Sequence, residues 1–284
     1  MTYVIHGATG AQGAPVVSAL AATGRPLVAL TRNADAVVKG AARVVSADYS
    51  SAEQLTAAYR GAAGVFVHLP LGAEADRVRY ARTVLAAIRE ARPSRVVFST
   101  SGSGGGALDE PADSAVSTLT SGLEAGEVSF AVVQPRLFLE NLLLPPVLDA
   151  ARERGVLRYP LRADYPVSWA SHLDVAEVAA ALFDRPDITG VIAVGQDPAV
   201  TGPDLAAAFG ARLGREVAYE AITPTAFGAS IAPLFGEGPA AGVAGLYQAL
   251  GALAGNAIAP ERSAQQLLGL SPRTTGRWLA DIGL

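Results

Sequence analysis

Three glycines near the amino terminus carry the clearest chemical signal in this chain. Gly7, Gly10 and Gly13 stand in the run VIHGATGAQGAPVV, after an apolar stretch and before an apolar helical pattern. A strand, a glycine-rich turn and a helix start in this order bind the diphosphate of a dinucleotide, because glycine permits close backbone approach and the helix start offers free N–H groups. The context on both sides favours this site over an ordinary turn. The predicted site also includes Thr9 and Gln12, within the same run.

The residues after the second expected strand indicate which dinucleotide is bound. An NAD site carries Asp or Glu about 20 residues beyond the glycines, whereas this chain reads Leu30-Thr31-Arg32-Asn33 there. The planar guanidinium of Arg32 suits a 2′-phosphate, which predicts NADP(H) over NAD(H). The alternative is that Arg32 is an ordinary solvated residue. Asp48 and Tyr49, after the third strand, are predicted to contact the adenine, with an ordinary loop acid as the alternative.

Few side chains near this site could transfer a proton. His68 ends the fourth expected strand, where ligands bind in an open parallel sheet, and imidazole titrates near neutral pH. Ser99 ends the fifth strand and could hydrogen-bond a substrate oxygen or a nicotinamide. Both are predicted as catalytic residues and as cofactor contacts; a hydrogen-bonded structural histidine is the alternative for His68. His6 is expected to be structural. His172 is expected to lie at the start of a helix, where Asp174 caps the helix or helps to dock the two domains.

An alternation of strands and helices must position these residues. Apolar strands separated by helices predict an α/β fold with a parallel sheet covered on both faces. The expected domain comprises residues 1–150, with sheet-completing segments around 166–195, and residues 151–284 mainly form a substrate-binding lobe. Strands are expected at 3–5, 26–30, 41–45, 65–69, 95–99 and 130–133, and helices at 13–23, 51–59, 73–91 and about 112–124.

Composition narrows the function classes. Half of the 284 residues are hydrophobic and 17% are charged, so a full core is available. The net charge of −4 comes without a basic run, which argues against nucleic acid as a partner. The absence of cysteine excludes disulfides and thiolate chemistry, and three dispersed histidines do not form a metal site.

Two further features bear on location. The amino terminus lacks the basic and apolar regions of a signal peptide, so a cytoplasmic protein is expected. Residues 239–260 carry no charge but contain several glycines and polar residues. They predict a buried or interface helix lined with small residues rather than a membrane span.

Several segments together resemble a known family. They are GATGAQG, LTRN, ADY, VVFSTSG (96–102), QPRLFLENLL (134–143) and PVSWASHLDVAEVAAALF (166–183). From residue 1 to about 280 the chain resembles the NmrA-like group of atypical short-chain dehydrogenase/reductases, with Gln134 where arginine is common. The resemblance implies a Rossmann doubly wound parallel sheet with a small C-terminal α+β substrate lobe. It also implies NADP(H) binding through the three glycines and Arg32, with His68, Leu69 and Pro70 along the cofactor.

The usual acid–base pair of short-chain dehydrogenases is missing. They use a Tyr-x-x-x-Lys motif, yet this chain has no tyrosine between Tyr80 and Tyr159 and no lysine after Lys39. Hydride transfer itself needs no side-chain acid, because the cofactor carries that chemistry. The favoured function is an NADP(H)-dependent oxidoreductase, similar to quinone reductases, that reduces a small or medium apolar acceptor: a quinone, enone or imine. The alternatives are a redox-sensing regulator that binds NADP(H) without catalysis and a cofactor-assisted cyclase or isomerase with no net redox.

The second half of the chain supplies the expected substrate contacts. These are Leu137, Phe138, Asn141, Tyr165 and Trp169, with Tyr159 and Phe227 completing an aromatic wall. The alternative is that the aromatic residues simply fill the core. The serine- and glycine-rich run 101–106 is expected to be a lid or a plain linker. The expected partner is a small-molecule substrate, with no membrane, and a homodimer is one assembly left open.

Overall fold

The first lobe is built on a seven-stranded parallel sheet. The computed structural model describes residues 2–33, 35–102 and 111–284. The strand order is β10-β6-β5-β4-β1-β2-β3, which reverses direction between β1 and β4. This order confirms the predicted Rossmann doubly wound α/β fold. The strands are β1 (Thr2–Ile5), β2 (Leu27–Thr31), β3 (Arg43–Ser46), β4 (Ala62–His68), β5 (Arg95–Ser99), β6 (Ser129–Pro135) and β10 (Gly190–Val194).

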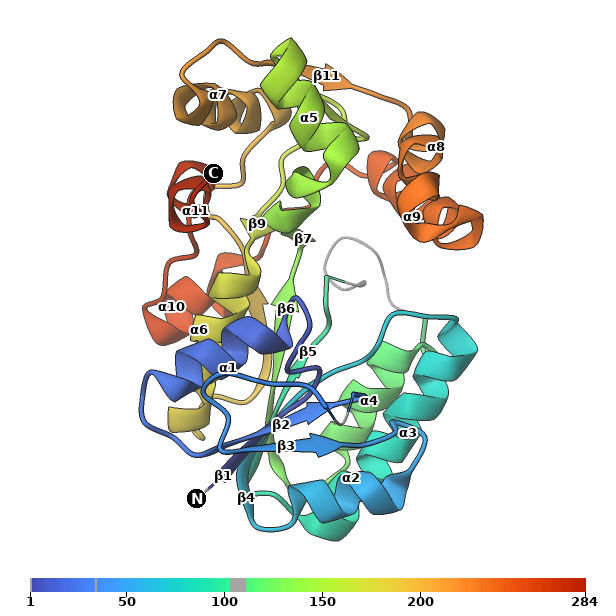
Figure 1. Cartoon of the computed structure of the whole chain (residues 1–284), viewed down its shortest axis with the longest axis vertical. Helices are drawn as coiled ribbons and strands as arrows, with labels where there is room; N and C mark the ends of the chain where they lie inside the picture. Colours follow the sequence, from blue (N-terminus) through green and yellow to red (C-terminus); the bar gives the residue numbers. More distant parts are fainter. Residues whose placement is uncertain (1, 34, 103–110) are drawn as a thin grey trace.

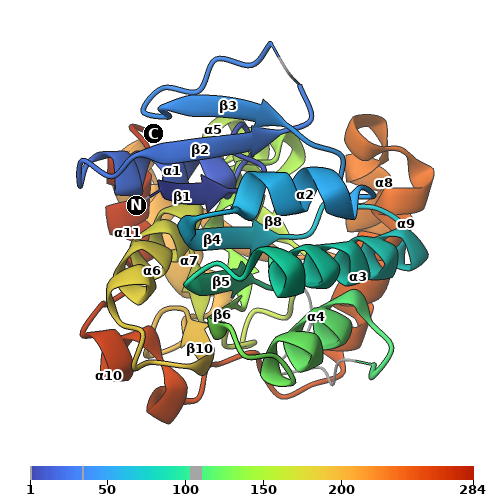
Figure 2. The same cartoon turned by 90° about the horizontal axis from the view of Figure 1, so that it is seen from below.

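Helices cover both faces of this sheet, as Figure 2 shows. One face carries α1 (Gly13–Ala21) and α6 (His172–Asp184); the other carries α2 (Ala52–Tyr59), α3 (Glu74–Ala91) and α4 (Ala115–Glu124). Every residue of β2 and β5 is therefore buried, which explains the apolar runs at residues 27–30 and 96–98. The predicted strands and helices of the first lobe are all present, and their ends differ from the expected ones by three residues at most. The largest shifts are at β4, which begins three residues early at Ala62, and at α4, which begins only after Ser114 caps its first turn.

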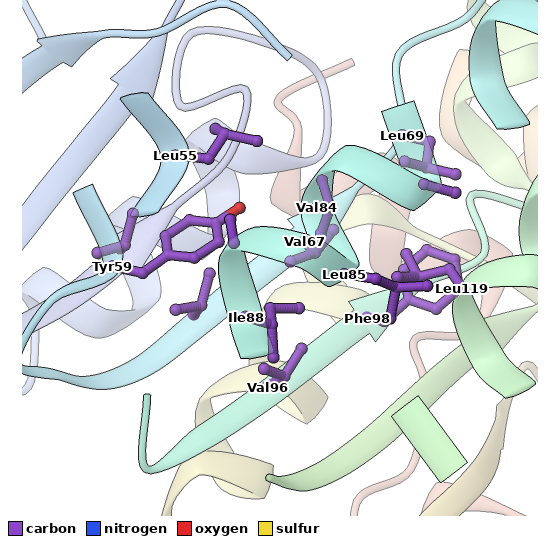
Figure 3. Close-up of a cluster of buried hydrophobic side chains, with 14 of the residues drawn as sticks. Leu55, Tyr59, Val67, Leu69, Val84, Leu85, Ile88, Val96, Phe98 and Leu119 are labelled. Carbon is purple, nitrogen blue, oxygen red and sulfur yellow. The ribbon is translucent and has the colours of Figure 1, made fainter. Parts of the chain in front are cut away.

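Two apolar cores sandwich the sheet. Figure 3 shows the core beneath α2, α3 and α4, where side chains of the helices meet those of β4 and β5. Its labelled members are Leu55, Tyr59, Val67, Leu69, Val84, Leu85, Ile88, Val96, Phe98 and Leu119. The core on the opposite face joins α1 and α6 to the sheet through Val16, Leu20, Phe66, Val97, Val175 and Leu182. These two cores hold the carboxyl ends of the strands in fixed positions.

The second lobe lies beyond those carboxyl ends (Figure 1). It contains α5 (Pro145–Arg154), α7 (Gly202–Leu213), α8 (Pro224–Phe235), α9 (Glu237–Gly251) and α11 (Thr275–Asp281). Two small sheets complete it: β8 (Val156–Tyr159) with β11 (Ala218–Ala221), and β7 (Leu137–Phe138) with β9 (Trp169–Ala170). The chain passes between the two lobes more than once. Both β10, which pairs with β6, and α10 (Ala264–Leu268), which packs beside β10, belong to the first lobe.

An ion-pair network built around the buried Asp174 ties the last helix of the chain to α6. Arg273 donates to Asp174 at 2.8 Å, to Glu177 at 2.5 Å and to Asp281 at 2.8 Å. Asp174 also accepts from the backbone N–H of Ser171, so it closes a capping box at the start of α6. This arrangement confirms the predicted capping and docking role of Asp174.

The expected helix over 239–260 is shorter and more exposed than predicted. It corresponds to α9, which ends at Gly251 and buries only Ala240, Tyr247 and Leu250. A Cβ at Gly242 or Gly245 would meet no described atom within 4 Å. Most of its small residues therefore lie on an outer face rather than in a tight interface. Among the described residues, no helix is both long and apolar enough to cross a membrane.

Candidate functional site

The glycine-rich turn after β1 tolerates no side chain at two positions. Gly7 has a positive φ of 55°, and a Cβ there would lie closer than 3.0 Å to the Nε2 atom of His68. A Cβ at Gly13 would lie equally close to the carbonyl oxygens of His6 and Gly7. Within the turn, the N–H of Gly10 donates to the Gly7 carbonyl at 2.7 Å. The backbone is thus exposed to a ligand on one side and packed tightly on the other.

The start of α1 is open to an anion. Among the described residues no side chain caps this helix, and its first turn carries no acid. The positive end of the helix dipole therefore faces the turn, although the Ala14 N–H is bonded to the Gly10 carbonyl. Thr9 is exposed on the turn, and Gln12 lies just before the helix. This cradle fits the diphosphate of a dinucleotide.

Arg32 stands at the end of the neighbouring strand β2. Its side chain is exposed, and no carboxylate of the described residues forms an ion pair with it. Asp48 is also exposed, but its carboxylate accepts hydrogen bonds from the backbone and side chain of Ser50. Tyr49 is buried with its ring against His6, so only Asp48 of the predicted adenine contacts faces solvent. Arg32 fits a 2′-phosphate beside the glycine-rich turn.

A cavity of about 600 Å³ opens between the two lobes. Its wall begins at the turn with Gln12, continues along the ends of β4 and β6, and finishes on α8 and α9 of the second lobe. A few polar groups interrupt a mostly apolar lining, as in small-molecule sites. The lining includes Ala11, His68, Leu69, Pro70, Leu71, Arg136, Leu137, Phe138, Asn141, Leu144, His172, Phe227, Ile231, Phe235, Pro239, Val243, Leu246 and Tyr247.

A second hollow of similar size lies elsewhere. It measures about 550 Å³ and is bounded by α3 and α4, next to Ser94 and Ser129. Those residues stand at the amino ends of β5 and β6, whereas open α/β sheets bind ligands beyond the carboxyl ends. We therefore take the cavity between the lobes as the candidate site.

The predicted substrate contacts divide into two groups. Leu137, Phe138 and Asn141 line the cavity. Tyr165 and Trp169 do not; each is 1% exposed and belongs to the core of the second lobe, where Trp169 packs against Tyr159 with ring centroids 5.5 Å apart. Their predicted role in an aromatic wall is therefore wrong, because packing within the second lobe covers their rings.

Ser99 is also placed differently from its predicted role. Its side chain is fully buried, and its hydroxyl donates to Oε1 of Gln12 at 2.8 Å. Gln12, not Ser99, lines the cavity. The expected direct contact of Ser99 with substrate is corrected accordingly: Ser99 reaches the site through Gln12. The lid expected over 101–106 lies largely outside the described residues, since 103–106 are not among them.

Two histidines face each other across the glycine-rich turn. His68 lines the cavity, and its Nε2 is buried without a hydrogen-bond partner among the described residues. Burial lowers the pKa of His68. His6 is fully buried below the turn and shares a 2.6 Å hydrogen bond with the hydroxyl of Tyr59. Burial, with a smaller effect from His68, lowers the pKa of His6 to about 3, which fits its expected structural role.

Polar groups from the second half complete the cavity, and the sequence did not single them out as a unit. The hydroxyls of Tyr159 and Tyr247 are hydrogen-bonded to each other, and both also interact with Asn141. His172 packs its ring on Phe138, with centroids 4.2 Å apart. The described residues contain no cluster that could hold a metal ion.

Comparison with known proteins places the chain in a family. A model of the NmrA-like family matches residues 1–266. The chain belongs to the NmrA-like family. This result confirms the resemblance read from the glycine motif and the later segments.

Individual relatives share the same architecture as this NmrA-like chain. An NAD(P)H azoreductase of Xenophilus azovorans is 31% identical over 226 residues, which span 78% of this chain and 77% of that protein. A quinone oxidoreductase of Escherichia coli, solved with NADPH, superimposes with a TM-score of 0.78 at 22% identity over 99% of both chains. A nucleoside-diphosphate-sugar epimerase of Staphylococcus aureus reaches 0.81 at 18% identity, covering 98% of this chain and 99% of that one. At such identities the two structures establish a shared fold.

Removing the Ser99 hydroxyl from this NmrA-like protein should weaken cofactor binding more than turnover. Ser99→Ala leaves the Gln12 amide without its donor, and a lost buried hydrogen bond costs about 1 kcal/mol. We expect the Kd for NADPH to rise about fivefold with kcat nearly unchanged. Fluorescence titration and steady-state kinetics measure the two effects. Ser18→Ala, which alters an exposed hydroxyl on α1, is the control. A large fall in kcat at constant Kd would instead give Ser99 a direct chemical role.

His6 should make the protein less stable in acid. Its pKa is depressed to about 3 in the folded state, whereas an exposed histidine titrates near 6.5. Between these values the unfolded chain binds the extra proton, so the free energy of unfolding falls as the pH drops; at pH 5 the loss is about 2 kcal/mol. Urea denaturation from pH 7 to 4.5 should show this slope, and His6→Gln should flatten it. An unchanged slope in that variant would assign the acid sensitivity to other groups.

Proposed function

We propose that this protein is an NADPH-dependent reductase that delivers hydride to an apolar, conjugated acceptor, without a Tyr-x-x-x-Lys pair. The observation that carries the proposal is the continuity of the cavity. It runs from Gln12 at the glycine-rich turn to the apolar side chains of α8 and α9. A cofactor cradle and a pocket for an apolar molecule thus share one space. The family membership and the 31% identical azoreductase support the same class of activity.

The residues of the first lobe would hold the cofactor. NADPH, when bound, supplies the hydride. Gly7, Gly10 and Gly13 let the backbone approach the diphosphate, with Thr9 and Gln12 beside it. Arg32 would pair with the 2′-phosphate, which selects NADPH over NADH, and exposed Asp48 lies near the expected adenosine.

Two roles were predicted for His68, catalysis and cofactor contact, and its position favours the second. Its ring nitrogen lies against Gly7, in the turn itself. Its buried, unpaired Nε2 would gain a partner from a bound dinucleotide. Leu69 and Pro70 extend the same wall. Ser99 would act through Gln12, by holding the amide of that side chain in one orientation.

The acceptor would occupy the remaining part of the cavity. Leu137 and Phe138 supply apolar contacts, and Asn141 with the Tyr247 hydroxyl offers hydrogen bonds to a heteroatom. Apolar walls with few fixed polar groups suit flat molecules such as quinones, enones and imines. The printed names of the azoreductase and of the quinone oxidoreductase add azo compounds and quinones as the first acceptors to test.

The test is a turnover assay with the purified full chain. NADPH oxidation is followed with a panel of quinones, azo dyes, enones and imines, and product is identified by mass spectrometry. We expect at least one acceptor to be reduced, with NADPH preferred to NADH. Tight NADPH binding without reduction of any acceptor would overturn the proposal and favour a redox-sensing regulator. Conversion of a substrate without net NADPH consumption would favour a cyclase or isomerase.

A further inference from the structure

We propose that His172, positioned by Glu140, donates the proton that accompanies hydride transfer to the acceptor. This assignment rests on the proposed reductase function and names the acid that the missing Tyr-x-x-x-Lys pair leaves open. It is carried by three observations: the place of His172 on the cavity wall, the unpaired oxygen of Glu140 beside it, and the order of the strands beneath both.

The strand order places His172 near the reactive end of a bound dinucleotide. A dinucleotide crosses the sheet where the strand order reverses, here between β1 and β4. With the 2′-phosphate at Arg32 after β2, the nicotinamide half extends over the ends of β4, β5 and β6. Phe138 follows β6, and the ring of His172 packs on it while lining the cavity. His68, by contrast, lies against the diphosphate turn.

Glu140 is fixed by one carboxylate oxygen and leaves the other unpaired. Its Oε1 accepts from the Ser171 hydroxyl at 2.7 Å, from the His172 backbone N–H at 3.1 Å and from the Trp278 indole at 3.2 Å. Its Oε2 is buried, has no hydrogen-bond partner among the described residues, and lies 3.9 Å from Nδ1 of His172. A small movement of the ring closes that gap, and a carboxylate on Nδ1 leaves Nε2 as the nitrogen that can give a proton to a ligand.

The charged or titratable groups around this imidazole are Glu140, His68 and Arg136. Burial lowers the pKa of His172, and the Glu140 carboxylate raises it again. His68 lies within electrostatic range across the cavity, where His172 helps to lower its pKa. Arg136 is a further cation on the wall of the same cavity. Among the described residues, Glu140 is therefore the carboxylate that favours the protonated form of His172.

The proposed step balances in protons and electrons. The acceptor takes a hydride from NADPH, which becomes NADP⁺, and negative charge develops on the acceptor heteroatom. The Nε2–H bond of the His172 imidazolium breaks as an O–H or N–H bond forms on that atom. The neutral imidazole is then reprotonated by water from the open side of the cavity.

The tyrosines of the cavity are weaker candidates for the same task. The Tyr247 hydroxyl is engaged with that of Tyr159, and burial raises the pKa of Tyr247 to about 12. In short-chain dehydrogenases a lysine lowers such a pKa, but the only lysine of this chain is Lys39. A tyrosinate formed at Tyr247 would have no cation of that kind to stabilise it.

The experiment compares His172→Gln, Glu140→Gln and Tyr247→Phe in the full chain, with an acceptor that the wild type reduces. In the wild type, kcat/KM should fall as the pH rises through the pKa of His172, since the protonated form is required. His172→Gln should remove this fall and lower kcat about tenfold, less than the ~10²–10⁴ of a positioned general acid, because water in the cavity replaces part of its role. The Kd for NADPH should change less than twofold.

A second readout does not depend on turnover. In the ligand-free protein, NMR titration should give a lower pKa for His172 in Glu140→Gln than in the wild type, because the neutral amide no longer favours the imidazolium. An unchanged pH profile in His172→Gln, an unchanged NMR pKa in Glu140→Gln, or a loss confined to Tyr247→Phe would overturn the assignment alone. Absence of any reduction by the wild type would overturn the proposed function and this assignment with it.

Discussion

Replacing Gly13 with alanine is expected to abolish NADPH binding. The new Cβ would lie closer than 3.0 Å to the carbonyl oxygens of His6 and Gly7, both of which are backbone atoms. Because backbone cannot rotate away as a flexible side chain does, the turn must deform and the start of α1 must shift. A displacement that costs more than about 4 kcal/mol of binding free energy weakens affinity by roughly 1,000-fold. Isothermal titration calorimetry with NADPH measures this loss directly.

Gly276→Ala is the matched control for this substitution. Gly276 lies exposed in α11, where a Cβ would meet no described atom within 4 Å. Alanine should leave NADPH affinity unchanged there and raise helix stability by about 0.5–1 kcal/mol. Circular dichroism of both variants separates loss of binding from loss of fold. Retained affinity in a folded Gly13→Ala variant would mean that the diphosphate binds elsewhere.

Replacing Arg32 with alanine should convert the NADPH preference that we propose into near indifference between NADPH and NADH. Arg32 is exposed beside the turn and has no ion-pair partner among the described residues, so its charge is available for a phosphate. Charge-assisted hydrogen bonds contribute about 1.5–3 kcal/mol, which corresponds to roughly 10- to 150-fold in Kd. NADH lacks the 2′-phosphate, and its Kd should change less than twofold. Fluorescence titrations with both cofactors give the ratio.

Arg43→Ala provides the comparison for Arg32. Arg43 is also exposed but begins β3, at the opposite end of the sheet from the ligand-binding edge. The Arg43→Ala substitution removes the same charge from the chain but leaves the cofactor site unchanged. Equal weakening of NADPH binding by both substitutions would indicate a general electrostatic effect, and equal weakening of NADPH and NADH by Arg32→Ala would argue against 2′-phosphate recognition.

The fold and the cofactor end of the site could be predicted because their signals are local. The glycines of the turn and the apolar strands follow each other within short stretches, and the central strands β2 and β5 are buried along their whole length. Hydrophobic residues that recur every two or every 3.6 residues, or a continuous apolar run, then indicate a strand or a helix directly. Family segments spread along the chain added the second lobe, which periodicity alone did not define.

The acceptor end could not be predicted in the same way, because burial there depends on distant segments. Ser99 ends a strand as expected, yet Gln12 covers it from a turn 87 residues earlier. Trp169 has the character of a pocket residue but is enclosed by the second lobe. The pairing of His172 with Glu140 joins two segments 32 residues apart, and neither residue alone differs from an ordinary surface histidine or acid.

The return of the chain to β10 has a consequence for how such proteins change their specificity. A fragment cut at residue 150 would lose β10 and leave the N–H and C=O groups of β6 as an open edge, a template for aggregation. Recombination at a single crossover there would pair the β6 of one parent with the β10 of the other. Exchanging an internal insertion, such as the stretch from α7 to α9, avoids this mismatch, because β6 and β10 then come from the same parent. Chimeras designed to transfer acceptor specificity between relatives should therefore have their junctions on either side of such an internal stretch.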